Sequence, residues 1–415
     1  MNEHLEAQLK RFHEFKHMGL ALDMTRGKPS SEQLDLANGM LDCLSSGDYR
    51  AEDGTDCRNY GGFDGIPEAA RLFAAFLGVG PKELLVGGNS SLAFMHDCVA
   101  RCYLHSNADS DVAWRELPAV KFLCPSPGYD RHFFVCENLG IQMVTVDVTE
   151  DGVDMDQVEA LVADDPAVKG IWIVPKYSNP TGYSCSSETV RRLATMKTAA
   201  PDFRIFWDDA YGHHHLGAGE DQVDNILAAC KAAGNPNRPF LFGSTSKVSF
   251  AGSGIALFGA SEPNVAWMRY HGTRRSIGPD KLNQLRHVRF FGDIGGLRAH
   301  MDKHAAILGP KFAKVDEVLH EELGGGDWAT WTKPKGGYFI SVDTRDGLAK
   351  RVVALAAECG VKLTPAGNTF PYGKDPRDRN IRIAPSLPPV NELELATRIF
   401  ATCVKIATLE QELAG

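Results

Sequence analysis

The chain has 415 residues, of which 43% are hydrophobic and 23% charged, and its formal net charge is −9. This length fits two or more packed units of a globular protein. The excess of acidic residues argues against a large surface that binds nucleic acid or an anionic membrane. No apolar run approaches the roughly 18 residues of a membrane-spanning helix, and the polar N-terminal segment lacks a signal-peptide core. Ten scattered cysteines without C-x-x-C spacing favour a reducing, cytoplasmic environment.

Short, almost wholly apolar runs recur along the middle of the chain. They lie at 120–125, 143–148, 170–175, 203–208, 240–245 and 255–260. Such β-rich runs without alternation are expected in a sheet that is covered on both faces. Helical patterns lie between them, for example at 154–162 and 187–200. This rhythm predicts a three-layer α/β domain with a mostly parallel central sheet.

A long helical stripe follows the sheet region and leads to a smaller α+β unit. Its apolar positions are spaced by three, four or a multiple, and they are Leu297, Met301, Leu308, Phe312, Val315 and Leu319. The smaller unit is expected to contain the segments 336–343, 345–359 and 380–386. We therefore expect a large domain over 51–299 and a small domain over 300–415, with residues 1–50 packing against the small domain.

Three of the apolar runs end in residues that could carry chemistry. The 170–175 run leads to Asn179, the 203–208 run ends at Asp208 with Tyr211 close behind, and the 240–245 run leads to Lys247. In parallel sheets ligands bind at the carboxyl ends of the strands. Each residue also has an ordinary structural alternative, as a turn residue, a helix cap or a surface charge. Their occurrence at the ends of three runs favours one shared site.

These residue types suit a cofactor with a pyridine ring, a phenolic oxygen and a phosphate. A lysine that forms an imine must be partly unprotonated, and a pyridine nitrogen stays protonated only beside a carboxylate such as Asp208. Asn179 and Tyr211 could donate hydrogen bonds to the phenolic oxygen. The Gly87-Gly88-Asn89-Ser90-Ser91 segment precedes a helical pattern and offers backbone N–H groups and hydroxyls to the phosphate.

The motif order GGNSS, PGY, SNPTG, DDAY, S-x-S-K and a late R-x-A resembles that of fold-type-I aminotransferases that use pyridoxal 5′-phosphate (PLP). These belong to the aspartate aminotransferase superfamily. The stretches LDMTRGKPSSEQLD, DGTDCRNYGG, PGYDRHF, AAGNPNR and IRIAPSLPP are similar to a bacterial subgroup typified by corynebacterial enzymes and often grouped with MocR-like proteins. The resemblance spans nearly the whole chain and implies PLP as the cofactor and a homodimer with shared active sites.

By motif position, the resemblance implies a role for each candidate residue. Lys247 would bind PLP covalently and move protons at the substrate α-carbon, and Asp208 would pair with the pyridinium nitrogen. Asn179 and Tyr211 would bond the phenolic oxygen, and Tyr129 would stack on the ring.

The remaining implied roles concern the phosphate and the substrate. Ser90, Ser91, Ser244 and Ser246 would contact the phosphate, and Tyr60 would reach the phosphate in the neighbouring subunit. Arg382 would bind the substrate α-carboxylate bidentately, and Gly27 would lie near the substrate entrance.

Two features depart from this pattern or leave it open. Ile255 stands where family members commonly carry an arginine for the phosphate, so hydroxyls, backbone donors or another cation must replace it. A dicarboxylic substrate needs a second cation, and the candidates are Arg26, Lys28, Arg274 and Arg275. His132 is expected near Asp208. The consecutive histidines 213–215 cannot all face one ion from a regular element, so no metal site is expected.

The expected function is a ping-pong transfer of an amino group between an amino acid and a 2-oxo acid, with aspartate and 2-oxoglutarate as the leading pair. The alternatives are an aminotransferase for another amino acid, or a PLP β-lyase or decarboxylase. A MocR-like regulator is less favoured, because only about 20 residues precede LDMTRGKP, too few for a winged helix. The Gly252-Ser253-Gly254 turn lacks the third glycine of a dinucleotide loop.

Overall fold

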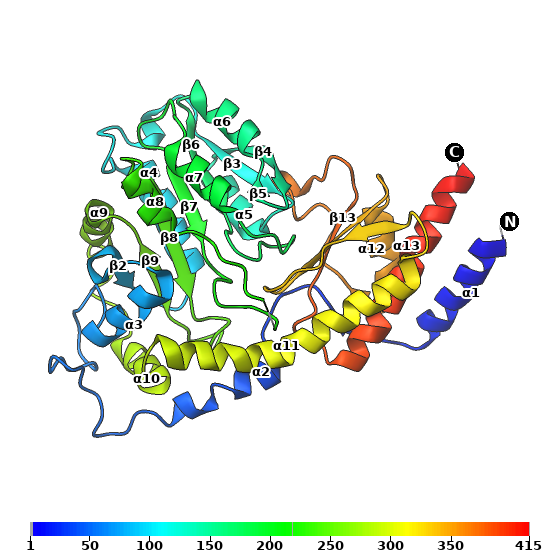
Figure 1. The fold of residues 1–415 in the computed structure, drawn as a ribbon, viewed down its shortest axis with the longest axis horizontal. Coiled ribbons are helices and arrows are strands. Elements are labelled where there is room, and N and C mark those ends of the chain that lie inside the picture. Colours follow the sequence, from blue (N-terminus) through cyan, green and yellow to red (C-terminus); the bar gives the residue numbers. More distant parts are fainter. Residues whose placement is uncertain (1–2, 218, 415) are drawn as a thin grey trace.

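The computed structural model describes residues 3–217 and 219–414 and places an eight-stranded sheet at the centre of the large domain (Figure 1). In spatial order the strands are β2 (Leu84–Val86), β9 (Ala256–Gly259), β8 (Pro239–Ser244), β7 (Arg204–Asp208), β6 (Val168–Ile173), β3 (Lys121–Ser126), β4 (Gln142–Thr149) and β5 (Gly152–Val153). The five strands from β8 to β4 are mutually parallel, whereas β9 and β5 run antiparallel to their neighbours. All six predicted runs are strands of this mostly parallel sheet, so the predicted fold class is confirmed.

The two faces of the sheet are covered by different helices. Aromatic side chains such as Phe122, Trp172 and Phe206 pack on one face, and aliphatic ones such as Ile171 and Ile205 pack on the other. The aromatic face is covered by α4 (Ser91–Leu104), α5 (Asp130–Asn138) and α9 (Glu262–Gly272), and the other face by α6 (Met155–Ala163), α7 (Ser187–Thr195) and α8 (Ile226–Ala232). Burial on both faces explains why these strands read as continuous apolar runs.

The helix predicted over 187–200 is shorter than expected. It ends at Thr195, and the chain then turns so that the Ala199 N–H donates to the Val162 carbonyl over 2.8 Å. Pro201 follows, and a residue before proline is disfavoured in helical geometry. The helix predicted over 154–162 corresponds to α6, and Asp154 caps it by accepting from the Asp156 and Gln157 N–H groups.

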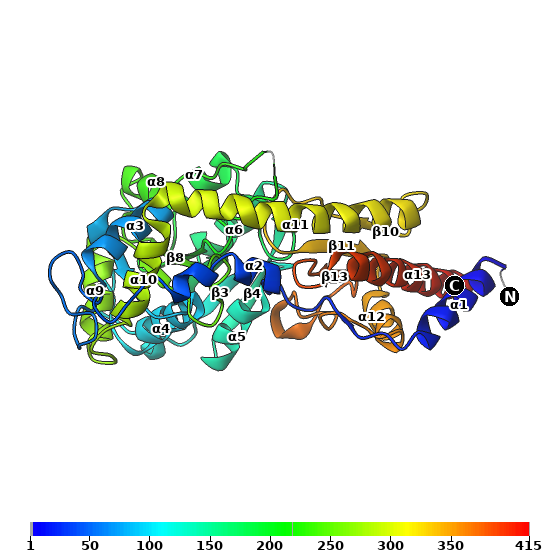
Figure 2. The ribbon, with the colours of Figure 1, turned by 90° about the horizontal axis from the view of Figure 1, so that it is seen from below.

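The small domain is an antiparallel sheet with helices packed on it. Its strands are β10 (Ala329–Trp331), β11 (Ile340–Thr344) and β13 (Asn380–Ile383), and its helices are α12 (Ala349–Glu358) and α13 (Val390–Ala414). The helix α11 (Ile294–Leu323) runs from the large domain along the small one (Figure 2). Every residue of the predicted apolar stripe is buried in α11, which confirms that prediction.

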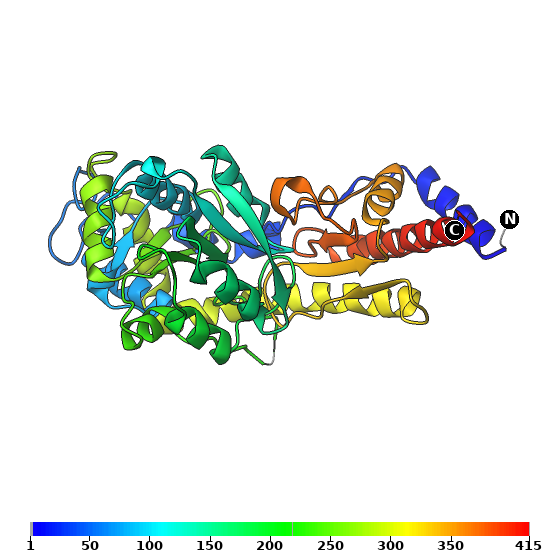
Figure 3. The ribbon, with the colours of Figure 1, turned by 90° about the horizontal axis from the view of Figure 1, so that it is seen from above.

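The N-terminal segment contacts both domains. The helix α1 (Glu3–His17) packs against α13 (Figure 3). The strand β1 (Leu22–Asp23) pairs with β12 (Val361–Lys362). The following α2 (Ser31–Asp35) and the 3₁₀ helix η1 (Asn38–Leu41) contact α11 and α10 (Lys281–Phe291), respectively. The segment between β1 and α2 therefore crosses from one domain to the other.

The predicted domain boundaries at residues 50 and 299 stay a prediction, and residues 1, 2 and 415 in those ranges lie outside the described residues. The remaining elements are α3 (Pro67–Leu77), η2 (Pro81–Glu83), η3 (Trp114–Glu116) and η4 (Pro371–Gly373). No helix in the described part of the chain has both the length and the apolar character needed to cross a membrane.

Candidate active site

A cavity of about 470 Å³ lies between the two domains at the carboxyl ends of the central strands. Its large-domain wall includes Tyr129 after β3, Asn179 after β6, Tyr211 after β7 and Lys247 after β8. The opposite wall comes from the N-terminal segment and the small domain, and includes Arg382 on β13. Because β8, β7, β6 and β3 are adjacent and parallel, residues from four distant parts of the sequence meet here.

Lys247 lies in the turn that follows β8. Its Nζ lies 5.1 Å from the centre of the Tyr211 ring and 5.8 Å from that of Tyr338. Burial lowers the pKa of the Lys247 amine, while the negative charge of Asp208 acts in the opposite direction. A lysine with a lowered pKa has more of the free amine that nucleophilic attack requires.

Asp208 is the last residue of β7 and is only 2% exposed. Its Oδ2 lies 2.9 Å from His132 Nε2, which confirms the expected proximity of these two residues. The His132 ring stacks on Trp172 with a centroid distance of 4.4 Å. Oδ1 of Asp208 has no hydrogen-bond partner among the described residues. A buried carboxylate oxygen is costly unless it accepts a hydrogen bond, so this atom is suited to a ligand with a positively charged N–H.

Two phenols border the cavity near this carboxylate. Burial and the negative charges of Asp208 and Asp130 raise the pKa of Tyr129 to about 12. Burial also raises the pKa of Tyr211 well above its usual value, with contributions from Tyr129 and Asp208. Both side chains therefore remain protonated hydrogen-bond donors at neutral pH.

Arg382 links the small domain to the large domain. Its Nη1 donates to Asn179 Oδ1 over 3.2 Å and lies 3.6 Å from Asp130 Oδ1, and its Nη2 donates to Thr364 Oγ1 over 3.2 Å. The guanidinium lies over the Phe339 ring at 4.7 Å. Its Nε is buried and has no hydrogen-bond partner among the described residues. This fixed guanidinium at the cavity wall suits recognition of a carboxylate.

The four serines predicted for the phosphate lie around the start of α4. Ser90 is the N-cap of α4 but its hydroxyl does not cap the helix, and Ser246 Oγ donates to the Asn89 carbonyl over 3.2 Å. Ser244 pairs with Ala256, whose carbonyl accepts from the Gly87 N–H over 2.8 Å. Helix N-termini of this kind attract anions through their free N–H groups.

The family model for aspartate amino-transferases matches residues 2–415. The chain belongs to the aspartate aminotransferase family. It is 50% identical to an aspartate aminotransferase of Corynebacterium glutamicum, over 97% of this chain and 93% of that protein. A crystal structure of an aspartate transaminase from the same species matches with a TM-score of 0.96 at 49% identity, covering 98% of this chain and 96% of that one.

The fold is also similar to that of α-aminoadipate aminotransferase from Thermus thermophilus, complexed with N-(5′-phosphopyridoxyl)-L-leucine. That match has a TM-score of 0.77 at 20% identity and covers 97% of this chain and 95% of that one. The resemblance that the motifs indicated is confirmed.

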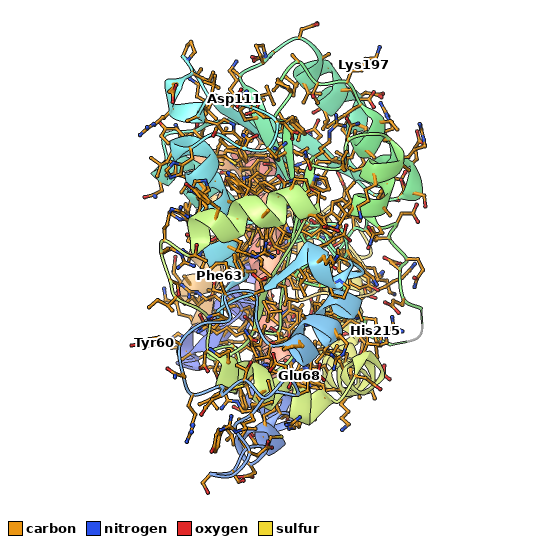
Figure 4. The ribbon with its side chains drawn as sticks, turned by 90° about the vertical axis from the view of Figure 1, so that its left-hand side faces the viewer. Tyr60, Phe63, Glu68, Asp111, Lys197 and His215 are labelled. Atoms are coloured by element: carbon orange, nitrogen blue, oxygen red, sulfur yellow. The ribbon has the colours of Figure 1, made fainter. Side chains whose placement is uncertain are left out.

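Gly27 and Tyr60 occupy contrasting positions in this aminotransferase. Gly27 lines the cavity, and a Cβ atom there would lie 2.6 Å from Cζ of Phe339. Tyr60 is 83% exposed and points away from the rest of its chain (Figure 4). The carbonyls on either side of it, those of Asn59 and Gly61, accept from Lys281 Nζ over 2.7 and 2.6 Å. The loop is therefore fixed while its tyrosine faces outward.

Two of the four cations expected for a substrate side chain line the aminotransferase cavity. Arg26 and Lys28 do so, whereas the Arg274 guanidinium lies over Tyr270 and Arg275 pairs with Asp97 over 2.9 Å. Arg274 and Arg275 are therefore outside the cavity of their own chain.

The structure adds two further cations to the cavity wall, Arg131 and Lys362. Arg131 stands two residues after Tyr129 in the PGYDRHF stretch, and this closeness is a signal in the sequence. Lys362 gave no signal in the sequence.

The remaining predictions about cations and metals concern Ile255 and the three consecutive histidines. Ile255 is 1% exposed, and its N–H donates to Thr245 Oγ1 over 2.8 Å, so this position contributes no charge. His213, His214 and His215 contact Phe76, Lys247 and Asp302, respectively, and so face different directions. Within the described residues, no group of three metal-binding side chains gathers.

Proposed function

We propose that this aminotransferase binds PLP and transfers the amino group of aspartate to 2-oxoglutarate in a ping-pong cycle. The observation that carries the cofactor assignment is the free, buried Oδ1 of Asp208, one strand away from the turn that bears Lys247. This oxygen suits a protonated pyridine nitrogen, and the free N–H groups at the start of α4 suit a phosphate. Bound PLP would supply an electron-withdrawing ring that acidifies the substrate α-carbon.

The residues of the chain have separate tasks in this proposal. Lys247 would hold the cofactor covalently and then carry a proton to and from the substrate α-carbon, for which its lowered pKa is suitable. Asn179 and Tyr211 would donate hydrogen bonds to the phenolic oxygen. Tyr129 would cover the ring, and Arg382 would orient the substrate through its α-carboxylate.

Charge around the cavity supports a dicarboxylic substrate. Arg26, Lys28, Arg131 and Lys362 line the wall, and among the described residues none of them makes an ion pair. Among the described residues of that wall Asp130 is the one carboxylate, and it lies 3.6 Å from Arg382. Unpaired cations attract the second carboxylate of aspartate or 2-oxoglutarate, and an apolar amino acid would gain nothing from them.

The proposal includes a homodimer with shared active sites in the cytoplasm. The exposed Tyr60 on a fixed loop supports the dimer, because a large aromatic side chain facing outward is a typical interface residue. Substitution of Tyr60 by phenylalanine is expected to weaken PLP binding. All ten cysteines are free thiols, as is usual in reducing compartments.

The test of the cofactor and the reaction is the visible absorbance of purified protein with PLP, before and after addition of aspartate alone. We expect a visible band that aspartate removes and 2-oxoglutarate restores, and that is missing in Lys247→Ala. Product analysis distinguishes a β-lyase or decarboxylase, which would release a different product from the same donor. Absence of the band in the wild-type protein would contradict the proposal.

The test of the substrate compares Arg131→Gln with the control Arg191→Gln. Arg191 pairs with Glu188 on the surface helix α7. Loss of a charged contact is worth about 1.5–3 kcal/mol, so the KM for aspartate should rise about tenfold to hundredfold while that for alanine stays unchanged. If Arg131→Gln leaves the KM for aspartate unchanged, the equivalent substitutions of Arg26, Lys28 and Lys362 identify the cation that binds the second carboxylate. If the KM for aspartate relative to that for alanine is unchanged in all four variants, the assignment of a dicarboxylic substrate is contradicted.

A further inference from the structure

The turn that carries Lys247 is fixed by buried histidines from two other segments. Among the described residues, no backbone N–H bonds to the carbonyl oxygen of Lys247 or of Val248. His214 Nε2 lies 3.3 Å from the Lys247 oxygen. His300 Nε2 and His304 Nε2, one turn apart on α11, lie 2.8 and 3.1 Å from the Val248 oxygen. Imidazoles thus occupy the positions that a regular element would fill with its own N–H groups.

The hydrogen-bond network fixes the tautomer of His304. A carbonyl oxygen only accepts, so a ring nitrogen bonded to it must carry the hydrogen. Gln33 Nε2 donates to Tyr338 Oη over 2.9 Å and lies 3.0 Å from His304 Nδ1, which therefore accepts. His304 Nε2 therefore carries the hydrogen, and its two neighbours are the Val248 oxygen and His300 Nε2, each at 3.1 Å. Gln33 belongs to α2, directly after the segment that lines the substrate cavity.

The rings are neutral donors at physiological pH. Burial lowers the pKa of His304 to about 4, with a further contribution from His300. Burial also lowers the pKa of His214 well below its usual value, helped by His304 and Lys247. The network can therefore hold the turn without placing additional positive charge beside the Lys247 amine.

We propose that His214, His300 and His304 are positioning residues that hold the Lys247 turn so that its amine meets the cofactor and the substrate α-carbon. The inference rests on the proposed role of Lys247 as the PLP lysine. A misplacement of the order of 1 Å in such a group costs roughly a hundredfold in rate. Ordinary core histidines would instead affect stability alone.

The experiment compares His304→Leu, which lacks the donor, with His304→Gln, whose amide nitrogen can replace Nε2. The control is His213→Leu, because His213 Nε2 bonds a carbonyl of the same kind, that of Phe76, over 3.0 Å. For each protein we would measure the rate at which the visible band forms when PLP is added to cofactor-free enzyme. The thermal midpoint, and kcat and KM for the preferred amino donor, complete the comparison.

We expect both the band-formation rate and kcat of His304→Leu to fall about tenfold to hundredfold with little change in KM, and His304→Gln to recover most of the loss. His213→Leu should keep both rates even where its thermal midpoint falls. If His304→Leu does not fold, His214→Leu and His214→Gln make the same comparison. Equal rates in all variants, or a rate loss in His213→Leu as large as in His304→Leu, would overturn the inference. A wild-type protein without the visible band would contradict the proposed function as well.

Discussion

His132 Nε2 lies 2.9 Å from Oδ2 of Asp208, and both side chains are buried in the large domain. The imidazole is held on its face by Trp172, with ring planes only 7° apart. One carboxylate oxygen is therefore fixed by an imidazole, and the other has no hydrogen-bond partner among the described residues. The geometry orients Asp208 through a second residue that would not itself touch the cofactor.

Replacement of His132 by phenylalanine should keep the stack on Trp172 and remove the donor to Asp208. A buried acceptor left unpaired costs about 1–3 kcal/mol, so we expect PLP to bind about tenfold to hundredfold more weakly. Titration with PLP, followed by tryptophan fluorescence, measures this change. His215→Phe is the control, since His215 makes the same type of contact, 3.0 Å to Asp302, with a carboxylate that is 70% exposed. Equal PLP affinity in wild type and His132→Phe would refute the role of His132.

Alanine at Gly27 should narrow the entrance to the cavity. The new Cβ would lie 2.6 Å from Phe339, whose ring supports the guanidinium of Arg382. Overpacking costs about 1–3 kcal/mol, so the KM for the amino donor should rise several-fold or more, with little change in PLP binding. Gly325→Ala provides the control, because a Cβ there meets nothing within 4 Å. A KM equal to that of the wild type would show that Phe339 moves without consequence.

The sheet and the residues at its strand ends could be predicted from the sequence, because both depend on short local patterns. A strand buried on both faces is apolar throughout, and the residue that follows such a run must lie at the ligand-binding edge. Asp208 and Lys247 could be selected as candidates on that ground, because residues of this kind end three separate runs. The pattern over 187–200 is helical throughout, whereas α7 ends at Thr195 and the Ala199 N–H bonds to the Val162 carbonyl, a tertiary contact that no local pattern indicates.

Contacts between distant segments could not be predicted from local patterns. Arg382 and Asn179 are separated by 203 residues and come from different domains, and only the family resemblance suggested the role of Arg382. Arg26 and Lys28 line the cavity, whereas Arg274 and Arg275 lie outside the cavity of their own chain, and local patterns do not distinguish these two pairs. Whether an arginine faces the cavity depends on how the domains pack, and a charge in a polar stretch carries no information about that packing.

The stability of the protein should decrease as the pH falls below neutrality. Burial lowers the pKa of His287 and of His304 from 6.5 to about 4, so the unfolded chain binds protons in this interval that the folded chain does not. The unfolding free energy contributed by each group is complete above about pH 6.5 and is lost as the pH falls toward 4. The free energy of unfolding measured with urea should therefore be lower at pH 5 than at pH 7 by about 2 kcal/mol per histidine.

The buried carboxyl group of Asp209 has the opposite effect on stability as the pH falls. Burial raises the pKa of Asp209 to about 6, so its protonation favours the folded state as the pH falls. A single group of this kind offsets only part of the loss from His287 and His304. In the variant His287→Gln the free energy of unfolding should depend less steeply on pH than in the wild type. An unchanged dependence would contradict the lowered pKa of His287.

Lysine at position 382 should bind substrate poorly although it keeps the positive charge. In Arg382 two terminal nitrogens serve different partners, Asn179 and Thr364, over 3.2 Å each, and one ammonium group cannot span both while also meeting a carboxylate in the bidentate geometry. We expect kcat/KM to fall about thirtyfold or more, because truncating a buried charged contact costs about 2–5 kcal/mol. The PLP absorbance should persist, since the role proposed for Arg382 concerns the substrate and not the cofactor. Arg192→Lys is the control, as Arg192 binds Glu159 through two nitrogens at the surface, where such a pair contributes little. Loss of the PLP band in Arg382→Lys would show that the arginine is needed to hold the two domains in their relative position. The decrease in kcat/KM could then not be assigned to the substrate α-carboxylate.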